Sequence, residues 1–197
     1  LELRRERVPY QLVGGQSFYD RKEIRDVLAY LKVLSNPNDE VSLLRILNTP
    51  PRGIGASTVE TLLRAAVAAG QPLWVVLPQA TENGDIPHER IESFRRMIEG
   101  FRSRLGSMPL AALVRELIGT VHYKAEIERV YKGAGDVEAR WQSIEELVNA
   151  IAQYEAREAQ PSLLGFLEDT TLAGREDQKD DDKDKRQLHA ITLMTLH

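Results

Sequence analysis

The sequence predicts a mainly α-helical fold with short β-strands at both ends of the chain. Three observations support this prediction: apolar residues recur at helical spacing over most of the chain, short extended runs occupy residues 10–13 and 189–197, and a Gly-Ile-Gly turn separates two helical segments. A chain of 197 residues is long enough to bury a core without disulfides, and this one contains no cysteine.

The first two helices are predicted from the residues at their ends. Asp20 and Glu23 have the spacing of a capping box at the start of the first helix, which continues to Asn36. Asp39 is expected to cap the second helix, because a side-chain oxygen at this position accepts a hydrogen bond from the first turn. The prolines at 50–51 cannot continue a helix and are expected to end it.

The third helix follows the glycine turn, and Ser57 and Glu60 are its predicted capping box. The same periodicity then continues through the rest of the chain, and each apolar stripe is expected to belong to a core rather than to a cofactor pocket. It predicts helices at residues 72–77, 88–105, 110–118, 124–131, 137–157 and 162–172.

The turn between the second and third helices is the strongest functional motif. Glycine reaches positive φ at little cost, so Gly53 and Gly55 can hold successive backbone N–H groups outward, and the next helix adds unpaired donors at its N-terminus. Ile54 is expected to anchor the turn in the core. A helix-hairpin-helix-like unit of this kind grips phosphates, although an ordinary glycine-containing connection fits the same motif. The candidate DNA-binding residues are Arg52, Gly53, Ile54, Gly55, Ala56, Ser57 and Thr58.

Charge is distributed unevenly along the chain, whose formal net charge is −4. Residues 1–64 carry ten Lys/Arg against eight Asp/Glu, whereas the remainder carries sixteen against twenty-two. Arg45 and Arg64 lie in the helices beside the turn, and no carboxylate occurs between Glu40 and Glu60. Any DNA contact is therefore expected to be local and to lie in the first third of the chain.

Several classes of site are absent from the sequence. It contains no Gly-x-x-x-x-Gly-Lys-Ser/Thr loop for nucleotide phosphates, its four histidines lack metal-ligand spacing, and it has no evident pair of nucleophile and base. The chain alone is therefore expected to have no catalytic residue, no metal site and no cofactor. No apolar run reaches the roughly 20 residues of a membrane span, so we expect a soluble, cytoplasmic protein without a membrane partner.

Three segments of the chain carry a family resemblance. They are Val-Pro-Tyr-Gln-Leu-Val-Gly-Gly-Gln-Ser-Phe-Tyr-Asp-Arg-Lys-Glu-Ile-Arg-Asp at residues 8–26, Asn-Thr-Pro-Pro-Arg-Gly-Ile-Gly at residues 48–55, and Ile-Thr-Leu-Met-Thr-Leu-His at residues 191–197. In this order and spacing they closely resemble the UvrD/PcrA/Rep type of superfamily 1 DNA helicase. The resemblance covers the whole chain and is weaker in its acidic middle.

The resemblance implies a division of the chain into four parts, and both chain ends are then expected to be cut edges of a longer protein. Residues 1–15 would be the edge of motor domain 2A and the first hinge, and residues 16–174 the helical 2B subdomain. Residues 175–188 would be a charged flexible linker and the second hinge, and residues 189–197 the returning strand of 2A at the start of motif V.

The resemblance also implies roles for individual residues. Gly14 and Gly15 match the first hinge, and Thr195 and His197 match residues on the single-strand track of the intact motor. The hairpin at residues 52–56 matches the part of the family that contacts duplex DNA. ATP and Mg²⁺ would serve the intact helicase, since the family's ATP-binding motifs are missing from this chain.

The function implied is that of a duplex-DNA-binding, regulatory 2B subdomain of an ATP-dependent 3′–5′ DNA helicase in repair or replication. Its partners would be duplex DNA and duplex/single-strand junctions, bound without regard to sequence, the motor domains of the same polypeptide, and DNA repair proteins. The alternative is a protein-docking or autoinhibitory module of the same helicase with little intrinsic DNA binding. An independent hydrolase would have to work without a recognisable site.

Overall fold

The computed structural model describes residues 18–78 and 88–171, and within these ranges the chain is helical and forms no β-strand. This confirms the prediction of a mainly α fold. The elements are η1 (Phe18–Asp20), α2 (Lys22–Ser35), α3 (Glu40–Ile46), α4 (Ala56–Ala69), α5 (Leu73–Val76), α6 (His88–Arg102), α7 (Leu110–Thr120), α8 (Tyr123–Val130) and α9 (Ala134–Arg157), followed by a helix at residues 163–171.

Some predictions fall outside the described residues. These are the two terminal strands, the linker, and the matched residues Gly14, Gly15, Thr195 and His197. The predictions made for them stay predictions.

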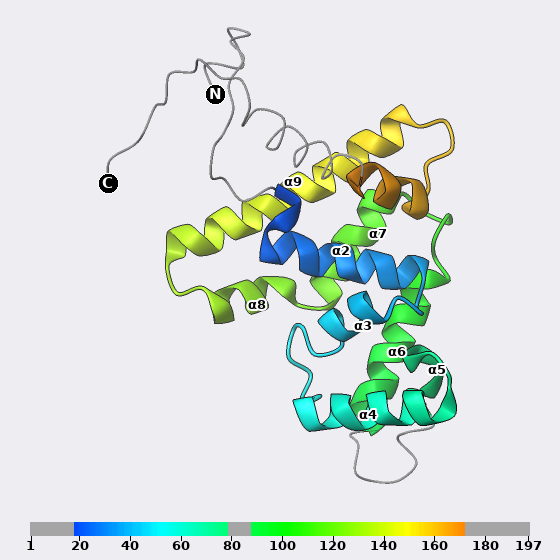
Figure 1. The fold of residues 1–197 in the computed structure, drawn as a ribbon. Helices are drawn as coiled ribbons and strands as arrows, with labels where there is room; N and C mark the ends of the chain where they lie inside the picture. The colour runs from blue at the N-terminus through cyan, green and yellow to red at the C-terminus, as the bar shows by residue number, and fades with distance from the viewer. Residues whose placement is uncertain (1–17, 79–87, 172–197) are drawn as a thin grey trace, which may run out of the picture.

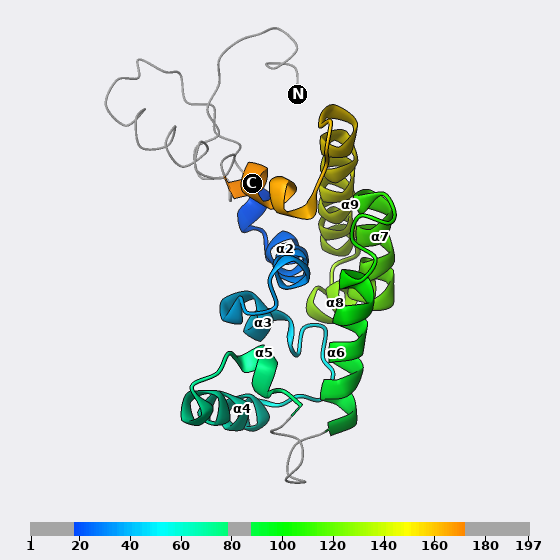
Figure 2. The ribbon, with the colours of Figure 1, turned by 90° about the vertical axis from the view of Figure 1, so that its right-hand side faces the viewer.

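Helix α2 lies at the centre of the fold. It packs against α3, α6 and α9, and it is buried on most of its surface, including Ile24, Leu31 and Val33, which have no measurable exposure. In Figure 1, α9 lies above α2 and α7 passes behind it, while α3, α5 and α4 follow below. Figure 2 shows α6, α7 and α9 stacked along one side of the molecule. Burial of one such aliphatic side chain contributes about 1.5–3 kcal/mol, and α2 has more buried residues than any other helix in the described ranges.

Two predicted capping boxes are wrong, and one predicted cap is confirmed. Helix α2 starts after a 3₁₀ turn with Arg21 in its N-cap, and an arginine side chain has no acceptor for the N–H groups of the first turn. Glu23 is buried and pairs with Arg140 at 3.3 Å. Helix α4 starts at Ala56, so Ser57 lies inside its first turn and cannot act as the cap. Asp39 does cap α3, since its side chain accepts a hydrogen bond from Ser42 N at 3.1 Å.

The remaining helices lie where the apolar periodicity predicts them, within a few residues at each end. Helix α3 ends at Ile46, four residues before the first proline, with Leu47 in its C-cap. The predicted apolar stripe of α9 is buried at Ile144, Leu147 and Ile151, whereas Trp141 at its edge is only half-buried. Among the described helices, none is both long and apolar enough to cross a membrane.

Candidate nucleic-acid interface

The candidate hairpin is the loop of residues 47–55, which joins α3 to α4 and reaches across to α6 (Figure 2). Ile54 is 1% exposed, which confirms that it anchors the turn in the core. Helix α3 packs chiefly against α2, and α4 packs chiefly against α5. The loop therefore joins two helices that belong to different packing pairs, and a compact helix-hairpin-helix unit is not confirmed.

Asn48 organises the loop from inside. Its Oδ1 accepts hydrogen bonds from the backbone N–H groups of Arg52 and Ile54, at 2.7 and 3.2 Å. These two N–H groups therefore point into the loop, whereas the sequence pattern predicted successive N–H groups pointing outward. Asparagine readily bonds to nearby backbone in turns, and this tendency is the one local signal that could have revealed its role.

The two glycines have different backbone requirements. Gly53 has a φ of +71°, in the left-handed region where glycine is favoured. Gly55 has a φ of −75° and a ψ of 170°, which any residue adopts, and a Cβ added there would meet nothing within 4 Å. The backbone conformation of the loop therefore requires a glycine at position 53 but not at position 55. Gly55 is the N-cap of α4 and is exposed.

The N-terminus of α4 is the most open part of the hairpin. The first intrahelical hydrogen bond runs from Val59 N to Gly55 O, so the N–H groups of Ala56, Ser57 and Thr58 have no helical acceptor. Ala56 and Ser57 are exposed, and Thr58 is half-buried. The first turn of α4 contains no acidic residue. These donors, together with the positive end of the helix dipole, make this turn suitable for an anion.

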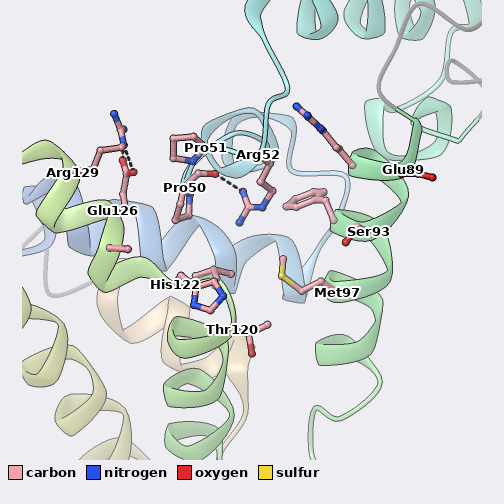
Figure 3. A pocket seen from close by; sticks show the side chains of 14 residues that line it. Pro50, Pro51, Arg52, Glu89, Ser93, Met97, Thr120, His122, Glu126 and Arg129 are labelled. Carbon is pink, nitrogen blue, oxygen red and sulfur yellow. Dashed lines mark hydrogen bonds and ion pairs between the residues drawn. The ribbon is translucent and has the colours of Figure 1, made fainter.

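Arg52 faces inward. Its Nη1 donates to the carbonyl oxygens of Ile46 and Pro50 at 2.9 and 3.1 Å, and its Nη2 donates to the Tyr30 hydroxyl (Figure 3 shows the bond to Pro50). The guanidinium also lies 5.3 Å from the ring centre of Phe94. Arg52 therefore ties the loop to α2, α3 and α6, a role that the sequence motif did not indicate.

Tyr30 is the buried partner of this arginine. It is 1% exposed, and its hydroxyl donates to the carbonyl oxygen of Thr49 at 2.6 Å while it accepts from Arg52. Burial raises the pKa of Tyr30 to about 12, because the phenolate is poorly solvated in the core, although the nearby Arg52 charge acts in the opposite direction. The neutral tyrosine therefore remains a hydrogen-bond donor to the loop over the physiological pH range.

The two other arginines near the turn are engaged in ion pairs. Arg45 donates to the buried carboxylate of Asp26 at 2.7 Å, and the same carboxylate accepts from Lys22 and Tyr123 at 2.7 and 2.6 Å. Burial, reinforced by Asp26, raises the pKa of Tyr123. Arg64 pairs with a carboxylate of its own helix at 2.5 Å. Each of these arginines is therefore paired with a carboxylate.

Arg90 is the exposed cation that the structure brings to the hairpin. It comes from the first turn of α6, and its Nη1 donates to the carbonyl oxygen of Gly53 at 3.1 Å. The two residues are separated by 37 positions in the sequence, so no local pattern could have paired them.

A pocket of about 750 Å³ opens beside the hairpin, between the loop, α6 and the α7–α8 junction (Figure 3). Its apolar side chains include Pro51 and Met97, and its charges are of both signs, since Arg129 is paired with Glu126 at 2.9 Å. His122 at its edge has a positive φ of 54°. Among the described residues no group of His, Asp or Glu side chains is placed to hold a metal ion. The hairpin offers backbone N–H donors and the pocket offers a concave surface beside it, and both features suit the binding of a ligand.

Comparison with known proteins covers the entire chain. Residues 1–197 match the family described as UvrD-like helicase C-terminal domain. The chain is 34% identical over 191 residues to the ATP-dependent DNA helicase PcrA of Bacillus subtilis (strain 168), covering 95% of this chain and 26% of that helicase. It is 33% and 32% identical to the PcrA helicases of Staphylococcus epidermidis and Staphylococcus aureus, over 96% of this chain and 26% of each.

The chain therefore spans about a quarter of the length of these relatives. The match to the family extends from the first residue to the last and includes the hairpin described above. The chain belongs to the UvrD-like helicases and corresponds to their C-terminal domain.

Proposed function

We propose that this chain is the duplex-binding, regulatory 2B subdomain of an ATP-dependent 3′–5′ DNA helicase, and that its α3–α4 hairpin contacts the DNA backbone. The observation that carries the local role is the exposed first turn of α4, where the N–H groups of residues 56–58 have no helical acceptor and which contains no acidic residue. Family membership and the similarity to PcrA helicases support the wider role.

The contact would not depend on base sequence. Backbone N–H groups and the hydroxyl of the exposed Ser57 bind phosphate oxygens, which are the same at every base pair, and such contacts position a protein on DNA without reading it. Gly55 has no side chain to hold the phosphate away from the helix end. Arg52 and Ile54 would serve by fixing the loop from within.

The rest of the helicase would supply the chemistry. In this proposal the motor domains of the same polypeptide bind ATP and Mg²⁺, and residues 16–174 form the 2B subdomain that holds the duplex. DNA repair proteins are its proposed further partners. Repair or replication is the proposed setting.

A protein-docking or autoinhibitory module is the second candidate. It is favoured by exposed carboxylates on α9 and in residues 163–171, which include Glu138, Glu146 and Glu168. Such a surface repels DNA and suits a basic protein partner. The two functions predict opposite results for duplex binding by the chain.

The test is fluorescence anisotropy of a labelled hairpin DNA with a 3′ single-stranded tail, titrated with the chain at several salt concentrations. We expect a Kd on the order of 10⁻⁴–10⁻⁶ M and a log–log salt slope equivalent to roughly two to four phosphates. The informative variant is Gly55→Asp. Its backbone conformation and free space accept an aspartate, which caps a helix as well as glycine or better, so the fold is retained.

The aspartate occupies the donors of the first turn and places a negative charge where the phosphate would lie. Gly55→Asp should therefore abolish duplex binding while leaving the free energy of unfolding unchanged or slightly increased. Asn149→Asp, at an exposed position on the distant helix α9, is the control with the same change of charge and should bind like the wild type. Equal binding by both variants, or no binding by the wild type at low salt, would favour the docking function.

A further inference from the structure

Arg90 and Gly53 are in closer contact than their hydrogen bond alone suggests. A Cβ built on Gly53 would lie 1.4 Å from Arg90 Nη1, so the guanidinium occupies the space that any other residue's side chain would fill. Gly53 is therefore suited to its position for two reasons, its positive φ of 71° and the approach of this arginine. The contact places the cation directly on the exposed hairpin.

The guanidinium retains free hydrogen-bonding capacity in this position. An arginine carries five N–H donors, and within the part of the chain that the structure describes, Arg90 forms its hydrogen bond through Nη1 and no ion pair with a carboxylate. The residue is exposed. The remaining donors can therefore bind a planar or tetrahedral oxyanion, for which arginine geometry is well suited.

The neighbouring arginine has less freedom. Arg52 uses its Nη atoms on Ile46, Pro50 and Tyr30, and its charge lies over aromatic rings. The two arginines thus differ in role, although only Arg52 lies within the sequence motif.

The location of Arg90 also suits the proposed DNA contact. Gly53 and Gly55 are two residues apart, so their Cα atoms lie within about 7.6 Å, and Gly55 is the N-cap of α4. A guanidinium resting on Gly53 is therefore close enough to the helix N-terminus to bind the same DNA strand. Both groups attract the same ligand, a phosphodiester.

We propose that Arg90, held by the Gly53 carbonyl oxygen, is a phosphodiester-contacting residue of the hairpin, and that Arg52 acts only by positioning the loop. This inference rests on the proposed function of the hairpin. It assigns the main cationic contact to a residue of α6 that lies outside the Gly-Ile-Gly motif.

The test uses Arg90→Lys, Arg90→Met and Arg90→Glu in the same anisotropy titration. The methionine variant should bind about 3- to 10-fold more weakly at low salt, and its log–log salt slope should fall by about 0.9, the value for one phosphate. The lysine variant keeps the charge and should retain the wild-type slope. The glutamate variant should bind more weakly than the methionine variant, because it repels the phosphate.

A purely structural role for Arg90 predicts a different pattern. Loss of the bond to Gly53 would then weaken binding equally in the methionine and glutamate variants, and lysine would not restore the salt slope. Arg96→Met is the matched control, since Arg96 is an exposed cation on the same helix. It should keep the wild-type slope.

The outcomes separate this inference from the proposed function. Wild-type affinity and slope in Arg90→Met, together with loss of binding in Gly55→Asp, would overturn the role of Arg90 and leave the hairpin contact in place. Equal losses in Arg90→Met and Arg96→Met would overturn it as well, because they would indicate a general effect of charge. Absence of duplex binding by the wild type would overturn both proposals.

Discussion

Replacement of Arg52 by alanine should destabilise the fold rather than act only on DNA binding. The change removes hydrogen bonds to the carbonyl oxygens of Ile46 and Pro50 and to the hydroxyl of Tyr30, and it removes the cation from the ring of Phe94. Hydrogen bonds from a charged donor contribute roughly 1.5–3 kcal/mol each, and a cation–π contact about 0.5–1 kcal/mol. Because the groups are only partly buried and share one side chain, we expect a total loss of roughly 2–4 kcal/mol.

The assay is urea unfolding followed by circular dichroism, which gives the free energy of unfolding and the m-value together. Arg64→Ala is the matched control, because Arg64 is 73% exposed and forms a surface ion pair, so its loss should stay within about 0.5 kcal/mol. Arg52→Lys should recover only part of the stability, since an ammonium cannot reach all the acceptors of a planar guanidinium. A double-mutant cycle with Tyr30→Phe should give a coupling energy of about 1 kcal/mol.

One result would refute the inward orientation of Arg52. A loss of stability below about 1 kcal/mol, accompanied by a fall of about 0.9 in the salt slope of duplex binding, would mean that the guanidinium faces the DNA and leaves the loop unsupported. The inward contacts would then contribute nothing measurable to the fold.

Three further changes test other parts of the structure. Gly53→Ala should lower the free energy of unfolding by about 1–2 kcal/mol, because alanine is strained at positive φ and displaces Arg90. Gly100→Ala in α6 should instead raise it by roughly 0.5–1 kcal/mol, because alanine favours a helix more than glycine does. Urea unfolding of both variants measures the difference. Asp39→Ala should cost about 1 kcal/mol through loss of the α3 cap, and a neutral result in the same assay would count against the cap. Folding raises the pKa of Tyr30 from 10.0 to about 12, so the neutral tyrosine contributes its full stability below pH 10 and this contribution is lost as the pH rises through 12. The wild type should therefore lose more free energy of unfolding than Tyr30→Phe between pH 10 and 12.

The helices and the anchoring of the hairpin could be predicted from the sequence because the interactions that set them are short-range. The period of apolar residues places α2, α6 and α9 within a few residues of their ends, and Asp39 bonds to a backbone group only three positions away. Ile54 is the lone aliphatic side chain of the turn, so burial of the turn required its burial. Family membership could also be predicted from the sequence, because the order and spacing of motifs can be recognised without knowing which residues are in contact.

Side-chain partners in the site depended on contacts that the sequence does not encode locally. Glu23 fits a capping box, but its carboxylate pairs with Arg140, 117 positions away, because packing of α9 on α2 buries it. Ser57 also fits a cap in the sequence, but the helix starts at Ala56 and its N-cap is Gly55. Ser57 therefore lies within the first turn, where its own backbone N–H is one of the groups that lack a helical acceptor.

The sequence by itself determined that this chain is a mainly helical member of the UvrD-like helicases with a glycine turn between two helices. Only the tertiary structure decided that Arg52 faces the core and that Arg90 occupies the outer side of the turn. The physical reason is that periodicity, caps and turns depend on neighbours within about four residues, whereas the direction of a long charged side chain depends on which acceptors the packed helices bring within its reach.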